Sequence, residues 1–409
     1  MHRLGLPLRG VRVVDFTWHG AGPYTTKMLA DHGADVIRIE TSKRLDSLRG
    51  LPPFKDKIPG VNRSGYFSDR NSNKRDMVLN LKHPAAREIA LRLIGQSDVV
   101  ANNFTPGTMA GLGLGYDDAR AVRPDVIYLE MAMQGAYGPD AELVGFGLTV
   151  SALTGLHHLS GSPGQAPVGT GTNYPDHISA PGHAAIAVLA ALRHRRRTGE
   201  GQYIDLAQTE TMVSLLGPAV LDWTVNRRNQ MPMGNLSDSA APHGVYACAG
   251  DDRWIALSAS TDTQWRALTA ELGRPDLASD ERFATLVDRH RNHAALDAEI
   301  TTCTRQRDAF ELMHALQQRG VPAGVAQTAQ DLLERDPQLR CREHFAILDH
   351  PEVGPSVYNA PPFRLCSVAD PIMRTPAPLL GQHTREVCID LLGMTDEEID
   401  RLVAEDVLV

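Results

Sequence analysis

Short apolar runs alternate with segments of helical spacing over the first 135 residues. The apolar runs, rich in Val and Ile, are 11–16, 35–40, 76–81, 98–104 and 125–133, and the helical segments are 22–34 and 84–96. Strands separated by helices indicate βαβ units, which form a parallel sheet whose ligands lie beyond the carboxyl ends of the strands. The pattern therefore predicts an α/β fold.

This alternation continues into the middle of the chain. Small apolar residues predict a helix at 181–197, which is followed by a turn and strand at 199–208. The next segment, 209–228, has the spacing of a long helix that Pro218 would kink.

The pattern changes near residue 230, where a polar loop with Gly and Pro begins. Residues 244–260 are typical of a hairpin, and helical segments follow them, so we expect a second, smaller α+β domain. From about residue 336 the chain is Pro-rich and irregular and ends in a short helix at 382–392. Such a tail is expected to wrap over other structure.

Composition excludes several classes of protein. The 409 residues suit two domains, and a net charge of −8 argues against a nucleic-acid partner. The five scattered cysteines form no C-x-x-C pair, so we expect neither disulfides nor zinc but a reducing, cytoplasmic setting. The start of the chain lacks the apolar core of a secretion signal, and no apolar run of about 18 residues occurs, so no membrane contact is expected.

Motifs for other chemistries are incomplete. The glycine-rich 111–116 follows a turn and lacks the spacing of a dinucleotide fingerprint, which weakens a dehydrogenase as an alternative. No G-x-S-x-G elbow is present. His177 and His183 are six apart, which does not suit two zinc ligands on one helical face, so we predict no metal site.

Two groups of cations stand out. The basic run 193–197 ends a helix, where cations complement the helix dipole and are ordinarily solvated. Lys74 and Arg75 stand in a small polar loop just before a strand. They could bind phosphate groups or could be ordinary loop cations.

Asp176 precedes the small-residue helix and has two interpretations. It could cap that helix, although it lies about five residues before the helix body, which is far for a cap. It could also be a nucleophile, because a helix N-terminus keeps a carboxylate ionised and the small residues around it leave room for a substrate.

Several longer segments together resemble the class III CoA-transferase family, which includes formyl-CoA and carnitine CoA-transferases and α-methylacyl-CoA racemases. The matching segments are LRGVRVVDFTWHGAGPYTTKMLADHGADVIRIE, NSNKRDMVLNLKHPAAREIALRLI, DVVANNFTPG, GLGLGYDDARAVRPDVIYLEM, RRRTGEGQYIDLAQTE and PLLGQHTREVCIDLLG. Their order and spacing span nearly the whole chain.

The resemblance implies roles for particular residues. Asp176 matches the family's nucleophile. The positions that match its coenzyme A contacts are His19, Gly20, Asn71, Ser72, Asn73, Lys74, Arg75, Asn103, Phe104, Thr105, Gln134, Gly135, Ala136 and Tyr137. The backbone N–H groups of Gly135 and Ala136 are candidates to stabilise an oxyanion. Coenzyme A enters as part of the substrate, and no tightly bound cofactor is expected.

The resemblance also implies an architecture. It predicts a Rossmann-like large domain built from both chain ends, at 1–225 and 331–409, with a small α+β domain at 226–330. Two ring-like subunits would interlock into a homodimer, or into a heterodimer with a related subunit.

The implied reaction moves CoA from an acyl-CoA donor, expected to be succinyl-CoA, to a carboxylic acid acceptor, with a succinate-type acid such as benzylsuccinate as one candidate. It would pass through an aspartyl mixed anhydride and an aspartyl-CoA thioester. Two alternatives within the family stay open. Racemases carry a catalytic histidine where Phe146 stands, which disfavours proton exchange, and the chain could be a non-catalytic partner subunit. The short segment at 239–250 replaces the long glycine-rich loop of formyl-CoA transferases, which argues against their specificity.

Overall fold

The computed structural model describes residues 5–409. Two compact units emerge from it: one comprises the chain up to His157 together with Gly169–Asn229 and Leu339–Val409, and the other comprises His158–Val168 and Gln230–Gln338. The first is called the large unit below and the second the small unit. The N-terminal and C-terminal parts of the chain thus belong to the same unit.

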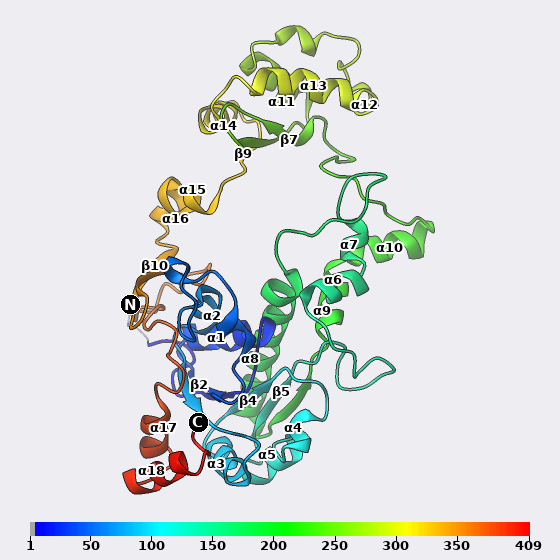
Figure 1. Ribbon diagram of the computed structural model, residues 1–409. Helices are drawn as coiled ribbons and strands as arrows, with labels where there is room; N and C mark the ends of the chain where they lie inside the picture. The colour runs from blue at the N-terminus through cyan, green and yellow to red at the C-terminus, as the bar shows by residue number, and fades with distance from the viewer. Residues whose placement is uncertain (1–4) are drawn as a thin grey trace. The chain divides into compact units, whose positions relative to one another are not determined.

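A six-stranded parallel sheet forms the centre of the large unit (Figure 1). Its strands are β1 (Arg12–Asp15), β2 (Asp35–Glu40), β3 (Arg75–Val78), β4 (Val99–Asn102), β5 (Ile127–Glu130) and β6 (Gln202–Asp205). They are ordered β3-β2-β1-β4-β5-β6, and all neighbouring strands pair in parallel. This is the Rossmann order, in which the chain reverses its direction of progress between β1 and β4. The predicted α/β fold with a parallel sheet is confirmed.

Helices cover both faces of this sheet, and other helices belong to the small unit. The helices of the chain are α1 (Ala21–Asp31), α2 (Gly65–Asn71), α3 (Pro84–Gly95), α4 (Thr108–Gly111), α5 (Tyr116–Val122), α6 (Gly147–Leu153), α7 (Leu156–Leu159), α8 (Ala180–Thr198), α9 (Gln208–Leu215), α10 (Gly217–Asn226), α11 (Asp262–Glu271), α12 (Leu286–Arg291), α13 (His293–Thr304), α14 (Ala309–Gln318), α15 (Ala329–Glu334), α16 (Pro337–Cys341), α17 (Thr384–Asp390) and α18 (Asp396–Ala404). Short 3₁₀ segments lie at Ser47–Gly50, Lys55–Lys57 and Pro275–Ala278, and a π-helical turn, η3, lies at Pro175–Ser179.

Alternate residues of β1, β2, β4 and β5 enter two separate hydrophobic cores. Val13 packs with α1 and α8, whereas its neighbour Val14 packs with α3, α5, α17 and α18. A sheet covered on both faces needs strands that are apolar throughout, which is why the strands were visible as continuous apolar runs.

The small unit has a three-stranded antiparallel sheet of its own. Strands β7 (His243–Ala247), β8 (Trp254–Ser258) and β9 (Ala323–Val325) lie in that order, and helices α11, α13 and α14 pack on them around the buried Trp265 and Phe283. The hairpin predicted at 244–260 corresponds to β7 and β8.

Two expectations about local structure need correction. The segment 209–228 is helical and is interrupted near Pro218, as predicted, but the interruption divides it into two helices, α9 and α10, because the chain leaves helical geometry at Leu216 and restarts with Pro218 in the first turn of α10. The tail contains an antiparallel hairpin, β10 (Phe345–His350) and β11 (Gly354–Asn359), that its proline content concealed.

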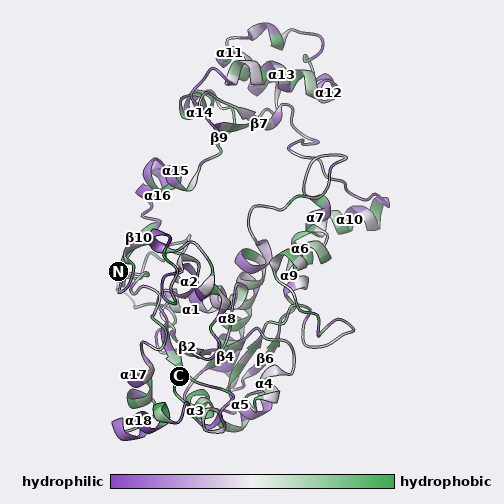
Figure 2. Ribbon diagram, viewed as in Figure 1, coloured by the Kyte–Doolittle hydropathy of each residue, from purple (hydrophilic) through white to green (hydrophobic). Residues whose placement is uncertain are grey.

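The tail also contains two helices that were not predicted, the short α16 and the longer α18. Thr395 and Glu398 form a capping box at the start of α18. The helix is largely hydrophilic in Figure 2 and buries only Ile399 and Leu402.

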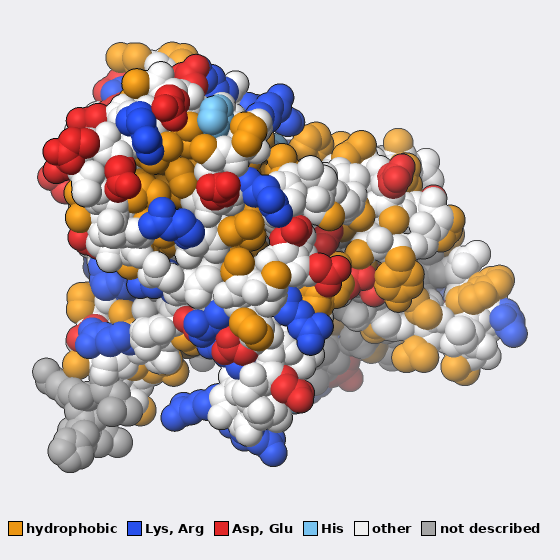
Figure 3. Space-filling view, turned by 90° about the horizontal axis from the view of Figure 1, so that it is seen from below, with side chains coloured by type: hydrophobic (Ala, Val, Ile, Leu, Met, Phe, Trp, Pro, Cys, Tyr) orange, Lys and Arg blue, Asp and Glu red, His pale blue; other side chains and the backbone are white. Residues whose placement is uncertain are grey.

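The surface carries both signs of charge. On the face shown in Figure 3, basic and acidic side chains are interspersed rather than separated by sign. Among the residues from 5 onwards, no helix is both long and apolar enough to cross a membrane, and no group of three or more His, Cys, Asp or Glu side chains could hold a metal ion.

Candidate active site

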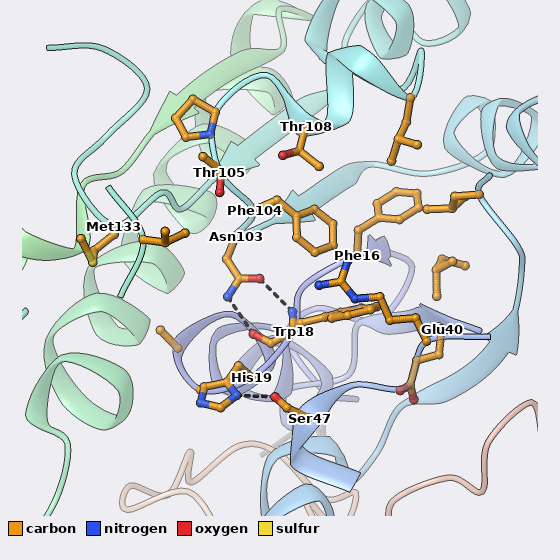
Figure 4. A pocket seen from close by; sticks show the side chains of 18 of the residues that line it. Phe16, Trp18, His19, Glu40, Ser47, Asn103, Phe104, Thr105, Thr108 and Met133 are labelled. Carbon is orange, nitrogen blue, oxygen red and sulfur yellow. Dashed lines mark hydrogen bonds between the residues drawn. The ribbon is translucent and has the colours of Figure 1, made fainter. Parts of the chain in front are cut away.

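A cavity of about 1050 Å³ opens in the large unit beyond the carboxyl ends of β1 to β4. Residues that follow β1 and residues that follow β4 form neighbouring parts of its wall (Figure 4). These two strands are the point where the strand order reverses, and crevices at such points are the usual ligand sites of open α/β sheets. The volume is at the upper end of the range for small-molecule sites.

Hydrogen bonds join the loops after β1 and β4. The N–H of Trp18 donates to Asn103 Oδ1 at 2.8 Å, and Asn103 Nδ2 donates to the carbonyl of Trp18 at 2.7 Å (Figure 4). The rings of Trp18 and Phe104 also meet edge to face, with centroids 5.8 Å apart. This part of the wall is therefore fixed before any ligand binds.

His19 has a backbone conformation that side chains seldom adopt. Its φ is 65°, and its N–H is 3.2 Å from both carboxylate oxygens of Asp46, which is itself paired with the buried Arg38. Its Nδ1 lies 2.6 Å from Ser47 Oγ (Figure 4), and its ring lies 4.6 Å from that of Phe146. Such strain persists only where surrounding structure enforces it, and it is typical of functional sites.

Asp176 lines the same cavity and is 5% exposed. Two glycines press against its carboxylate: a Cβ at Gly20 would lie 2.8 Å from Cγ, and a Cβ at Gly147 would lie 2.7 Å from Oδ2. Gly20 caps the N-terminus of α1, and Gly147 begins α6. The carboxylate is therefore held at two helix N-termini in space that only glycines leave open.

Burial raises the pKa of Asp176 above its usual value. The charge of His19, the backbone N–H of Gly147 and the charge of Arg70 oppose this rise. A carboxylate that is poorly solvated but still ionised is more reactive than one in water, so the site can present a nucleophile.

The expected distance between Asp176 and its helix is wrong. Asp176 lies on the π-helical turn η3, which runs directly into α8. Asp176 is therefore itself helical, and it does not cap the helix, because no side-chain hydrogen bond caps η3 or α8. π-helical turns inside helices frequently occur at functional sites.

Three cations line the cavity that sequence reasoning missed. Lys43, Arg44 and Lys82 all follow strands, the first two after β2 and the third after β3. Lys43 pairs with Asp406 at 2.9 Å, whereas Arg44 and Lys82 have no carboxylate within 4.0 Å among residues 5–409. The rule that ligands lie beyond the carboxyl ends of parallel strands could have identified them.

Comparison with known proteins identifies the family of the chain. Residues 8–384 match the profile of CoA-transferase family III. The chain belongs to CoA-transferase family III. It is 32% identical over 98% of both chains to succinyl-CoA–D-citramalate CoA-transferase of Chloroflexus aurantiacus, and 34% identical to succinyl-CoA:mesaconate CoA-transferase of Haloarcula marismortui over 98% of this chain and 99% of that protein.

A solved structure supports the family assignment. The CAIB/BAIF family protein from Brucella suis has a TM-score of 0.87 and 31% identity to this chain, covering 95% of it and all of that structure. Family and relatives indicate that the chain is an enzyme with CoA-transferase activity. The dehydrogenase alternative is thereby set aside.

The cavity collects six of the residues that the CoA-transferase resemblance indicated. They are His19, Gly20, Asn103, Phe104, Thr105 and Asp176. Phe146, the position of the racemase histidine, lines it as well.

Five other indicated residues, 71–75, do not line the cavity. Lys74 is fully buried, and its ammonium pairs with Asp15 at 3.0 Å. The Asn73 side chain donates a hydrogen bond to Asp31 and accepts one from the backbone N–H of Arg374 in the tail. Arg75 forms an ion pair with Asp35. Asn71 accepts from Lys74, and Ser72 is buried. The polar groups of this loop hold other segments of the protein in place. The cavity therefore gives no support to the contact between residues 71–75 and CoA that the resemblance implied.

The remaining indicated loop, 134–137, also lies outside the lining, although Met133 and Ala141 line the cavity. The N–H of Ala136 donates to Asp205 Oδ1 at 2.9 Å, so it is not free for an oxyanion. Gln134 accepts from Thr209 at 2.7 Å, Gly135 has a φ of 87°, and Tyr137 is 83% exposed.

Proposed function

We propose that the enzyme transfers CoA from succinyl-CoA to a second carboxylic acid through covalent intermediates on Asp176. The observation that carries this proposal is the buried Asp176 carboxylate, held between two glycines at a cavity large enough for an acyl-CoA. The relatives support the donor, because the names of both compared enzymes begin with succinyl-CoA.

The first half of the reaction transfers CoA to the enzyme. An oxygen of Asp176 attacks the thioester carbonyl of the donor, the C–S bond breaks, and a mixed anhydride forms as CoA leaves as a thiolate. The thiolate then attacks Cγ of Asp176 and breaks the anhydride C–O bond. The donor departs as a carboxylate, and an aspartyl-CoA thioester remains.

The second half reverses these steps with a different acid. The acceptor carboxylate attacks Cγ, the thiolate leaves, and a new anhydride links the acceptor to Asp176. The thiolate attacks the acceptor carbonyl, which regenerates the Asp176 carboxylate and releases the new acyl-CoA. The thioester's energy is conserved throughout, provided that water does not hydrolyse the anhydride.

Backbone N–H groups at the start of α1 and α6 are the best candidates to stabilise the oxyanions. Both helices begin against the Asp176 carboxylate, at Gly20 and Gly147, and helix N-termini favour developing negative charge.

Arg44 and Lys82 are the proposed ligands for the phosphates of CoA. Both line the cavity without a carboxylate partner among the described residues, and phosphate groups bind such cations through charge-assisted hydrogen bonds.

The acceptor is proposed to be a dicarboxylic acid. D-citramalate and mesaconate, named in the two relatives, are both dicarboxylates. Benzylsuccinate belongs to the same chemical type and stays a candidate. A racemase is less favoured, because the apolar Phe146 offers no base for an α-proton.

A second copy or a related subunit is proposed to cover α10. Leu221, Trp223 and Val225 on this helix are 62%, 46% and 75% exposed, which is unusual for a monomer's surface. Two relatives are named as alpha and beta subunits of one succinyl-CoA–L-malate CoA-transferase, so a heterodimer stays open. Interlocked subunits in the cytoplasm would fit both cases. Light scattering of the purified chain, alone and after Leu221→Asp, tests this surface.

Trapping the intermediate tests the function. Incubation with succinyl-CoA followed by hydroxylamine should place a hydroxamate on the peptide that carries Asp176, as read by mass spectrometry. Asp176→Asn should give no adduct. Transfer at full rate by that variant, or an adduct on another residue, would refute the proposal.

A further inference from the structure

A second group of polar side chains is connected through His177 to the segment that carries Asp176, and it does not line the cavity. His177 follows Asp176 on η3, and its Nε2 lies 3.1 Å from the Tyr66 hydroxyl. Its Nδ1 lies 2.8 Å from Thr172 Oγ1. Asp176 therefore lines the cavity, and its chain neighbour His177 joins it to this polar cluster.

Arg70 is the cation of this cluster. It lies in the last turn of α2 and is 7% exposed. Its guanidinium carbon lies 4.3 Å from the ring centroid of Tyr24 and 5.5 Å from that of Tyr66. Its Nη1 donates to Asp69 at 2.6 Å, and Asp69 is held from its other side by Asn359.

One donor of Arg70 is left unsatisfied. Its Nε is buried and has no hydrogen-bond partner among the described residues. Native proteins seldom leave a donor of a buried charged group unpaired, because no hydrogen bond then compensates for the lost hydration. A ligand group that supplies an acceptor there would remove this cost.

The cluster contains one cation, Arg70, which pairs with the carboxylate of Asp69. The pKa of His177 falls to about 4, mainly through burial and then through the charge of Arg70, so its imidazole is neutral near pH 7. Arg70 is then the positive charge of the cluster, and it also opposes the rise in the pKa of Asp176. When Asp176 becomes an anhydride or a thioester it loses its negative charge, and Arg70 loses that favourable interaction.

We propose that Arg70 binds the non-reacting carboxylate of a dicarboxylic acyl group, with the Tyr66 hydroxyl as a second donor. This inference rests on the proposed function. The reacting carboxylate must meet the CoA sulfur on the cavity side of Asp176, whereas Arg70 does not line the cavity. An arginine fork matches a carboxylate in geometry and charge, and stacking on Tyr24 holds it in orientation.

This arrangement makes Arg70 a specificity-determining residue. In this proposal the distal carboxylate of the acyl chain lies against Arg70, whereas a chain of equal length that ends in a methyl group would leave Nε unpaired. Sites built to bind a polar group reject analogues that lack it. The enzyme should therefore prefer succinyl-CoA to butyryl-CoA, which replaces the distal carboxylate by a methyl group.

The test measures release of the donor acid in a single turnover, with succinyl-CoA and with butyryl-CoA. Arg70→Gln should slow release of succinate by about 10- to 100-fold, which is the scale of one charge-assisted hydrogen bond, and should leave release of butyrate within about twofold. Arg70→Lys should recover part of the succinate rate, because it restores charge without the fork. Arg195→Gln is the matched control, because Arg195 pairs with Asp98 and lies outside the site.

Equal losses with both donors would show that Arg70 only supports the site and would overturn the inference. An unchanged rate for both donors would overturn it as well. Failure of the unsubstituted enzyme to release either acid would instead refute the proposed function, and the dicarboxylate role of Arg70 with it.

Discussion

Asp15 and Asp176 are both buried carboxylates of the large unit, and their surroundings are opposite. Asp15 is fully buried and accepts hydrogen bonds from Thr17, Thr26 and Lys74. No side chain of the described residues donates to Asp176, which meets two glycines and a cavity instead.

Their pKa values differ accordingly. Burial alone would raise the pKa of Asp15, but Lys74, Arg38 and two threonine hydroxyls hold it below the usual value. Burial raises the pKa of Asp176, and its neighbours offset this only in part. A buried carboxylate that is paired with cations and side-chain donors, such as Asp15, is structural. A buried carboxylate that faces a cavity without such partners, such as Asp176, is a candidate for chemistry.

The largest expected effect is the loss of CoA transfer when the Asp176 carboxylate is removed. Asp176→Asn should lower CoA transfer by about 10⁴-fold or more, because the nucleophile is lost. The free energy of unfolding should stay the same or rise, because a poorly solvated charge is removed. Steady-state assays and urea denaturation measure both. A large loss of stability would mean that Asp176 is structural.

Breaking the pair at Asp15 should have the reverse effect. Lys74→Met leaves Asp15 buried without its cation, which should cost about 3–5 kcal/mol of unfolding free energy. Lys82→Met, at a cavity-lining lysine, should change it by less than about 0.5 kcal/mol. Urea denaturation of both variants gives the comparison, and equal losses would contradict the assignment of Lys74 to structure and Lys82 to the cavity.

Crowding Asp176 should impair catalysis. The Cβ of Gly147→Ala would enter the space of the carboxylate, and displacement of the nucleophile should lower kcat by about 100-fold. Gly182→Ala in α8 is the matched control, because its Cβ would meet nothing within 4 Å. If both variants keep the original kcat, the glycines do not position Asp176.

Removing a phosphate ligand should weaken binding of the substrate alone. Lys82→Ala should raise KM for acyl-CoA by about tenfold with kcat unchanged, the effect of losing one charge-assisted hydrogen bond. The exposed Lys55→Ala should change neither constant. An unchanged KM for Lys82→Ala would remove Lys82 from the CoA site.

The smallest expected effect is on pH dependence. Asp176 must be ionised to attack, so kcat/KM should rise with pH through its raised pKa. His19→Asn removes a charge that lowers this pKa, and asparagine tolerates the positive φ, so the acid limb should move to higher pH. A shift to lower pH would contradict the role given to His19.

The sequence predicted the sheet well because the central strands β1, β4 and β5 are buried almost throughout and are therefore largely apolar. It hid the β10–β11 hairpin, whose strands are partly exposed and contain Pro355. The place of Asp176 came from family resemblance, since spacing alone allowed a cap.

The roles of the cations near the site could not be predicted from the sequence. Lys74 and Lys82 lie in similar polar surroundings along the chain, one before β3 and one after it. Only the fold shows that Lys74 turns inward to Asp15, whereas Lys82 lines the cavity. Arg70 gave no signal, because a cation in a short helix is ordinarily exposed.

The most direct test of the account is the transfer of oxygen from the acceptor to Asp176. The acceptor carboxylate attacks Cγ of Asp176, and one of its oxygens then bridges the two carbonyl carbons of the anhydride. The CoA thiolate attacks the acceptor carbonyl carbon, so the bridging oxygen stays on Asp176. After a single turnover with an acceptor whose carboxylates carry heavy oxygen, mass spectrometry should find one heavy oxygen in the Asp176 side chain. Turnover that leaves this side chain unlabelled would contradict covalent catalysis by Asp176.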